Sequence, residues 1–149
     1  MIKKVNYFFQ TVLFFLFFFL GRILGIKLSR KIFAFLFSYL GPFIKSKKVV
    51  NNNLHTFDKK ISESKKNQII DNMWKNYGMT FIEYIFLDYF KKSNTHIQII
   101  GQDNLSDPID KNKPVIFVSG HFANFELMSM EITKKNINVA TIYRPLNNF

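Results

Sequence analysis

The sequence predicts an α/β protein that begins with a transmembrane helix and continues into helices and a partial parallel sheet. Three observations indicate this architecture. An uncharged run occupies residues 5–21, helical periodicity follows over residues 62–92, and two runs rich in β-branched residues flank a helix in the last third of the chain. Strand, helix and strand within about thirty residues are typical of a βαβ unit, whose two strands are parallel.

The first predicted element is a membrane anchor over residues 1–26. The run VNYFFQTVLFFLFFFLG at residues 5–21 has no charged side chain, and Arg22 follows it. Its length as a helix is about 25 Å, and residues 23–26 extend it toward the hydrocarbon thickness of about 30 Å. A cleaved signal peptide is the alternative, but GRILGIKLSRK lacks a small-x-small cleavage site. The heavier basic flank after the run favours a single pass with a cytoplasmic body.

The second predicted part, residues 27–50, is a membrane-interface helix followed by a basic linker. The apolar run at residues 31–44 is too short to cross a bilayer, so we expect it to lie in the interface or against the anchor. Nine basic residues and no acidic residue occur in residues 1–57, within a chain of formal net charge +11. Basic residues beside apolar runs indicate an anionic membrane rather than nucleic acid as the partner.

The third predicted part, residues 51–149, is the beginning of a catalytic domain. Its helical stretch presents one broad apolar face, made of Ile69, Ile70, Met73, Trp74, Tyr77, Phe81, Ile82, Ile85 and Phe86. Gly78 interrupts this face, and it predicts either the close approach of a neighbouring helix or a break between two helices.

The predicted strands lie at residues 96–101, 114–118 and 138–143, with a helix over residues 124–135. So few parallel strands do not complete a domain, and the sequence stops where another helix should follow. We therefore expect a truncated domain.

The candidate chemistry lies where the second strand meets the helix. Ligands of open α/β sheets bind beyond the carboxyl ends of the strands, and His121 follows such an end. Glu126 comes five residues later, so the two side chains meet only if His121 lies in the turn and Glu126 in the first helical turn. A carboxylate so placed orients an imidazole and stabilises it once it has taken a proton. A chance spacing remains the alternative at this point.

Other reaction types have less support. Arg144 follows the last strand, where it would either bind phosphate or be a solvated residue at the strand end. Ser119 lacks the Gly-x-Ser-x-Gly context of a nucleophile, and it lies too near His121 along the backbone. The chain has no cysteine, which excludes disulfides and thiolate catalysis. No metal site and no cofactor is predicted, because no second histidine or carboxylate cluster accompanies His121.

Several blocks resemble the lipid A biosynthesis acyltransferases, the lauroyl- and myristoyltransferase family of Gram-negative bacteria, in order and over nearly the whole chain. Besides the N-terminal anchor, the blocks are Asn53-Leu54 with Phe57, Trp74–Gly78 with Glu83, Ile97–Gly101 with Asn104-Leu105, VIFVSGHFANFEL, and Tyr143–Asn148. The histidine-x4-acid motif is shared with glycerol-phosphate acyltransferases. Glutamate as the acid, together with the later Tyr-Arg-Pro, points to the lipid A branch. Ala123 and Phe125 stand where the family commonly has glycine and tryptophan.

The resemblance implies transfer of a fatty acyl group from acyl-carrier protein to a hydroxyl of a lipid A precursor, in lipopolysaccharide biosynthesis at the bacterial inner membrane. It assigns His121 and Glu126 as the catalytic pair, and Arg144 and Asn124 as substrate-binding residues. The implied partners are acyl-carrier protein, the lipid A precursor and membrane lipids, with no nucleic acid. The alternatives are a glycerol-phosphate-type phospholipid acyltransferase and a non-catalytic membrane-bound fragment.

Overall fold

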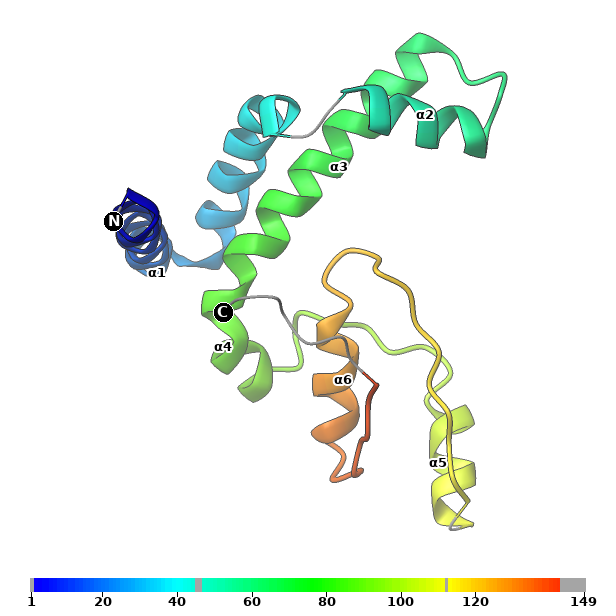
Figure 1. The fold of residues 1–149 in the computed structure, drawn as a ribbon. Coiled ribbons are helices and arrows are strands. Elements are labelled where there is room, and N and C mark those ends of the chain that lie inside the picture. The colour runs from blue at the N-terminus through cyan, green and yellow to red at the C-terminus, as the bar shows by residue number, and fades with distance from the viewer. Residues whose placement is uncertain (1, 45–46, 112, 143–149) are drawn as a thin grey trace. The chain divides into compact units, whose positions relative to one another are not determined.

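The structure is a computed structural model that describes residues 2–44, 47–111 and 113–142 (Figure 1). Its elements are α1 (Ile2–Ile44), α2 (Lys47–Phe57), α3 (Glu63–Glu83), the 3-10 turn η1 (Tyr84–Phe86), α4 (Leu87–Lys92), α5 (Asp103–Asp110) and α6 (Glu126–Thr133). The chain divides into two compact units, residues 1–87 and 88–149.

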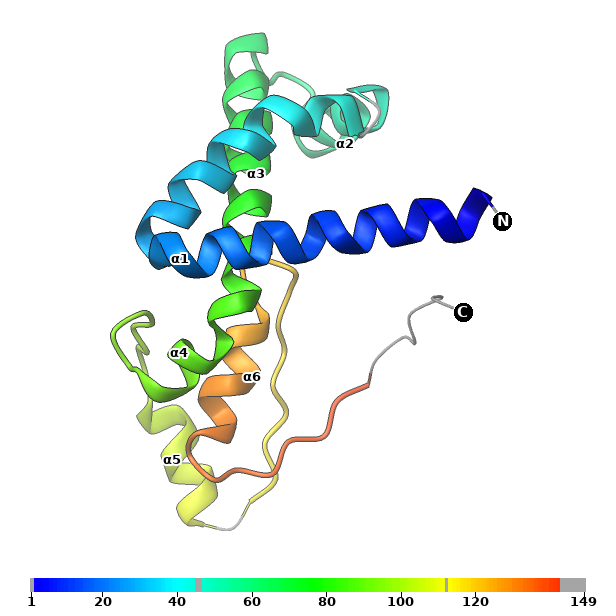
Figure 2. The same ribbon diagram turned by 90° about the vertical axis from the view of Figure 1, so that its left-hand side faces the viewer.

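In the first unit, α1 is a bent helix with two apolar arms. Gly25 has φ 72° and ψ 164°, a conformation that glycine adopts readily because it lacks a Cβ. Figure 2 shows the resulting change of direction between the two arms. Across the bend, the buried Ser29 hydroxyl donates to the backbone oxygen of Gly21 at 2.8 Å. The Phe17 and Phe33 rings lie 5.6 Å apart, so the two arms also contact each other next to the bend.

The helix α3 packs against both arms of α1 through the apolar face that the sequence predicts. Phe81 is the centre of an aromatic cluster that includes Phe14 and Phe18 from the first arm and Phe33 and Phe37 from the second. Trp74 and Ile82 are buried on the same face.

Gly78 permits the close contact between α3 and the second arm of α1. A Cβ atom added to Gly78 would lie 2.1 Å from the backbone oxygen of Phe33, so any side chain would push the helices apart. Because α3 runs through Gly78 without a break, the prediction of a close helix approach is confirmed and that of two separate helices is wrong.

Polar contacts also join α1 to the α3–η1 stretch. The Arg30 guanidinium lies 3.1 Å from the buried carboxylate of Glu83, and Arg22 donates to the backbone oxygen of Ile85 at 3.2 Å. Asp71 accepts hydrogen bonds from Lys75 and from Ser38 of the second arm, each at 2.5 Å. These two hydrogen bonds, that of Lys75 first, lower the pKa of Asp71 below its usual value.

The α1 helix is long and apolar enough to cross a membrane, as judged by length and composition over Asn6–Ile44. Most of its first arm is exposed in the chain by itself, including Tyr7, Phe8, Phe9, Phe15 and Phe19. A contiguous apolar surface of this kind is typical of a membrane or protein contact. The second arm packs along α3, which is rich in lysine and asparagine, and the first arm contacts α3 through Phe14 and Phe18.

The predicted partial parallel sheet in the second unit is wrong. Within residues 88–111 and 113–142, the structure contains helices and irregular segments and no strand, so the α/β fold class is not found. The segments at 96–101, 114–118 and 138–142 pair with no neighbour, and Ile116 and Val118 are 90% and 89% exposed. β-Branched residues favour strands mainly because they pack on a paired, half-buried surface, and no such surface is present around these segments. The helix predicted over 124–135 is present as the shorter α6.

Candidate functional site

His121 and Glu126 lie at the junction between an irregular segment and α6. His121 is exposed in the turn that precedes the helix, next to a tight turn in which the Phe122 amide donates to the Gly120 oxygen at 2.8 Å. Glu126 is the first residue of α6 and is also exposed. The structure therefore places these two residues on the turn and on the first helical turn, where they would have to lie in order to meet.

The two side chains do not pair directly. Within the part of the chain that the structure describes, no hydrogen bond or ion pair joins His121 to Glu126. The His121 ring instead stands edge-on to the ring of Phe125, with a centroid distance of 4.4 Å and an interplanar angle of 83°. The His121 ring is thus packed against an aromatic neighbour, while the residue as a whole is exposed.

Ala123, between the two candidate catalytic residues, has a left-handed backbone conformation with φ 47°. A non-glycine residue is strained there because its Cβ approaches the neighbouring backbone. Glycine, which the resemblance in the sequence leads one to expect at this position, adopts that conformation without strain. The backbone of the turn that carries His121 therefore has a conformation that favours glycine, although the residue at this position is alanine.

Of the two predicted substrate-binding residues, Asn124 lies within the described part of the chain and Arg144 lies outside it. Asn124 is half-buried just before α6, and its backbone oxygen accepts a hydrogen bond from the Leu127 amide at 3.2 Å. It therefore helps to begin the helix that carries Glu126. Arg144 lies outside the described residues. Among residues 2–44, 47–111 and 113–142, no group of three or more histidine, aspartate or glutamate side chains is arranged to hold a metal ion.

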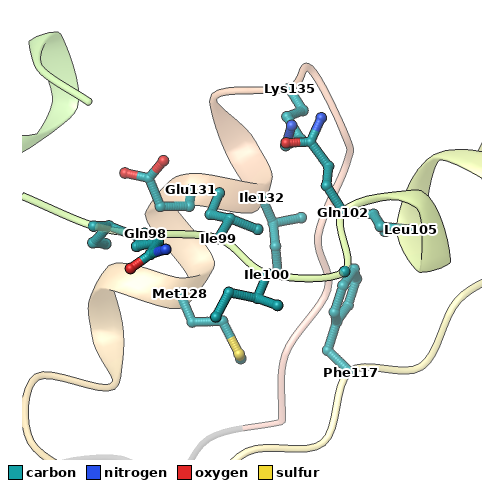
Figure 3. Close-up of a pocket in the computed structure, with 12 residues that line it drawn as sticks. Gln98, Ile99, Ile100, Gln102, Leu105, Phe117, Met128, Glu131, Ile132 and Lys135 are labelled. Atoms are coloured by element: carbon teal, nitrogen blue, oxygen red, sulfur yellow. The ribbon is translucent and has the colours of Figure 1, made fainter. Parts of the chain in front are cut away.

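An apolar cavity of about 490 Å³ opens on one side of α6 (Figure 3). Residues 97–102 form one wall, Phe117 lies at another, and Met128 and Ile132 face it from α6. Polar groups at Gln98, Gln102, Glu131 and Lys135 accompany the apolar lining. Its volume lies within the usual range for small-molecule sites, which is about 300–1,000 Å³.

Comparison with known proteins decides the family. The family model of the bacterial lipid A biosynthesis acyltransferases matches residues 2–149. The chain belongs to this family. No curated protein and no solved structure matches it. The protein is thus an acyltransferase of the lipid A biosynthesis type, as the motif and the block order indicated.

In this acyltransferase, sequence reasoning missed a cluster of charged side chains beside the cavity. Glu131 and Lys134 form an ion pair of 2.6 Å at a spacing of three residues, which the sequence could have suggested. The third member of the cluster is His96, whose Nε2 lies 3.3 Å from the Glu131 carboxylate. It is far away along the chain, so no local spacing rule finds it.

Proposed function

We propose that this acyltransferase moves a fatty acyl group from the thioester of acyl-carrier protein to a hydroxyl of a lipid A precursor, with His121 as the general base. His121 takes the hydroxyl proton while the acceptor oxygen attacks the thioester carbonyl. The tetrahedral intermediate then collapses, an oxygen ester forms, and the leaving thiolate takes the proton back from the imidazolium. Glu126 orients the imidazole and balances its positive charge.

The observation that carries this proposal is the exposure of His121 and Glu126 at one turn–helix junction, in a chain whose family acylates lipid A. Among the described residues, no hydrogen bond or ion pair joins their side chains in the free protein. Catalytic hydrogen bonds are often long or misaligned before substrate binds, and they shorten in the reacting complex. We therefore expect His121 to turn from the Phe125 ring toward Glu126 when the acceptor enters.

The remaining assignments follow the chemistry of the two substrates. Arg144 would bind a phosphate of the acceptor, and Asn124 would donate to one of its oxygens. The apolar cavity beside α6 would receive the acyl chain, because its walls are mainly isoleucine, leucine, phenylalanine and methionine.

We place the protein in the bacterial inner membrane, single-pass, with its catalytic part on the cytoplasmic face. The basic N-terminal third would attract anionic lipid and the acidic carrier protein.

The test is acyl transfer from radiolabelled acyl-carrier protein to a lipid A precursor, measured with the full chain in detergent. His121→Ala should lower the rate at least about a hundredfold, the scale expected for loss of a general base. Glu126→Gln should also slow transfer severely, because the imidazolium loses its counter-charge while the side-chain shape is kept. His55→Ala, at an exposed position of α2, is the matched control and should leave the rate unchanged.

Two results would change the proposal. Near-normal turnover by His121→Ala would remove the general-base role. Preference for a glycerol-phosphate lipid as competing acceptor would keep the mechanism and replace the substrate.

A further inference from the structure

A mostly buried charged cluster joins the C-terminal end of α6 to the segment around residues 90–96. The side chains of His96, Glu131 and Lys134 are 8%, 13% and 16% exposed. One carboxylate oxygen of Glu131 lies 2.6 Å from Lys134 Nζ and 3.3 Å from His96 Nε2. The His96 ring lies against the Phe90 ring at 4.5 Å, so the cluster has an apolar wall.

Lys134 makes the largest number of contacts in this cluster. Its ammonium donates to the backbone oxygens of Phe90 at 2.5 Å and Ser93 at 3.0 Å, and it lies 3.4 Å from Asn94 Oδ1. An ammonium has three hydrogens, so these acceptors and Glu131 satisfy it fully. Phe90 and Ser93 are at the C-terminal end of α4, where backbone oxygens have no partner within the helix. A lysine is well suited to bind such oxygens.

The cluster fixes the direction of α6. Ion pairs removed from water add little net stability, because the cost of desolvation offsets the attraction. The geometry of this cluster is defined by Lys134, whose three hydrogens all have acceptors. Among the described residues, the two ring nitrogens of His96 have no hydrogen-bond partner, so His96 contributes through packing and through its charge-dependent contact with Glu131. The eight residues of α6 form a rod of about 12 Å at about 1.5 Å per residue. Lys134 holds one end of this rod, and Glu126 begins the other end.

We propose that Lys134, together with Glu131 and His96, is a positioning group that fixes α6 on the end of α4 and so aims Glu126 at the His121 turn. This inference rests on the proposed roles of His121 and Glu126. Glu131 lines the cavity proposed for the acyl chain, but Lys134 and His96 do not. They act through the helix, so their removal should lower the rate of the chemical step without weakening substrate binding.

The first experiment is steady-state kinetics with the full chain. Lys134→Met should lower kcat about tenfold with both KM values changed less than about twofold, because small displacements of catalytic groups cost up to about a hundredfold in rate. Lys134→Arg should recover part of kcat, since it can still donate to the Phe90 and Ser93 oxygens. Lys92→Met, at the exposed last residue of α4, is the matched control and should leave kcat unchanged.

The second experiment reports on the helix independently of activity. Hydrogen exchange of the peptides covering 121–133 and 87–95 should become about tenfold faster in Lys134→Met, and stay unchanged in Lys92→Met, because the contact holding both segments is lost. Unchanged exchange and unchanged kcat would overturn the inference. So would a loss of active enzyme at unchanged turnover per active molecule, which is the signature of a purely structural residue.

A third variant covers a failure of Lys134→Met to fold. Glu131→Gln keeps the side-chain shape and an acceptor for Lys134, and it should lower kcat about threefold with faster exchange of the 121–133 peptide. Normal kcat and normal exchange in Glu131→Gln would then overturn the inference. If exchange becomes faster in these variants while His121→Ala keeps full turnover, the proposed function fails and the anchoring of α6 stands.

Discussion

Backbone strain is concentrated at one residue of the candidate site, Ala123. Its φ of 47° costs alanine about 1–2 kcal/mol, whereas glycine loses about 0.5–1 kcal/mol of conformational entropy on folding. The strain term is the larger, so Ala123→Gly should raise the free energy of unfolding by about 0.5–1 kcal/mol. Urea denaturation of the full chain in detergent measures this difference.

The matched control is Ala34→Gly, within the helical second arm of α1. There no backbone strain is relieved and a half-buried methyl group is lost, so the substitution should lower the free energy of unfolding by at least about 0.5–1 kcal/mol. Destabilisation of similar size at both positions would show that Ala123 is not strained.

At the scale of elements, the contact between α3 and the second arm of α1 depends on Gly78. Alanine would improve the helix propensity of α3 by about 1 kcal/mol. Its Cβ, however, would lie 2.1 Å from the Phe33 backbone oxygen, and such overpacking costs about 1–3 kcal/mol. We expect the steric term to win, so Gly78→Ala should lower the thermal midpoint, whereas Asn72→Ala on the exposed side of α3 should not. A raised midpoint for Gly78→Ala would contradict the close approach.

The cavity beside α6 yields a second prediction at this scale. Met128→Trp should fill part of the space between α6 and residues 97–102. Transfer of the longest acyl chains should then fall by about tenfold relative to shorter chains, because each methylene excluded from an apolar pocket changes the rate by about that factor or more. Met130→Trp, on the same helix but away from the cavity lining, is the control. An unchanged chain-length profile in Met128→Trp would place the acyl chain elsewhere.

For the whole molecule, membrane association is the main prediction. The exposed apolar side chains on the first arm of α1 predict that the chain stays in membranes after carbonate extraction, with its N-terminal segment retained. Replacing Leu13, Phe15 and Phe19 by glutamate should release it, because each buried charge opposes insertion by about 2.5–3.5 kcal/mol. The same charge change at Asn51, Asn52 and Asn53 of α2 should not.

Two outcomes would contradict the anchor. One is recovery of the intact unmodified chain in the soluble fraction. The other is a mature N-terminus after Gly25, which would show a cleaved signal peptide.

The sequence by itself determined the features that depend on neighbouring residues. Helices form through contacts between residues three and four positions apart, so a local pattern is enough to predict them. Such local patterns are the uncharged run of the N-terminal helix, the apolar face of α3, and the spacing that puts His121 in a turn and Glu126 at a helix start. The ordered blocks gave the family, which the match over residues 2–149 confirms.

The tertiary structure decided what depends on distant partners. The segments at 96–101 and 114–118 have strand composition, but strands form only when other segments pair with them, and the sheet predicted from them was wrong. The bend at Gly25 is stabilised across the fold by Phe81 of α3, whose ring contacts both arms. His96 meets Glu131, and Lys134 meets the Phe90 backbone oxygen, only because α6 packs on the end of α4. Such contacts join residues far apart in the chain, and only the packing of the whole unit brings them together.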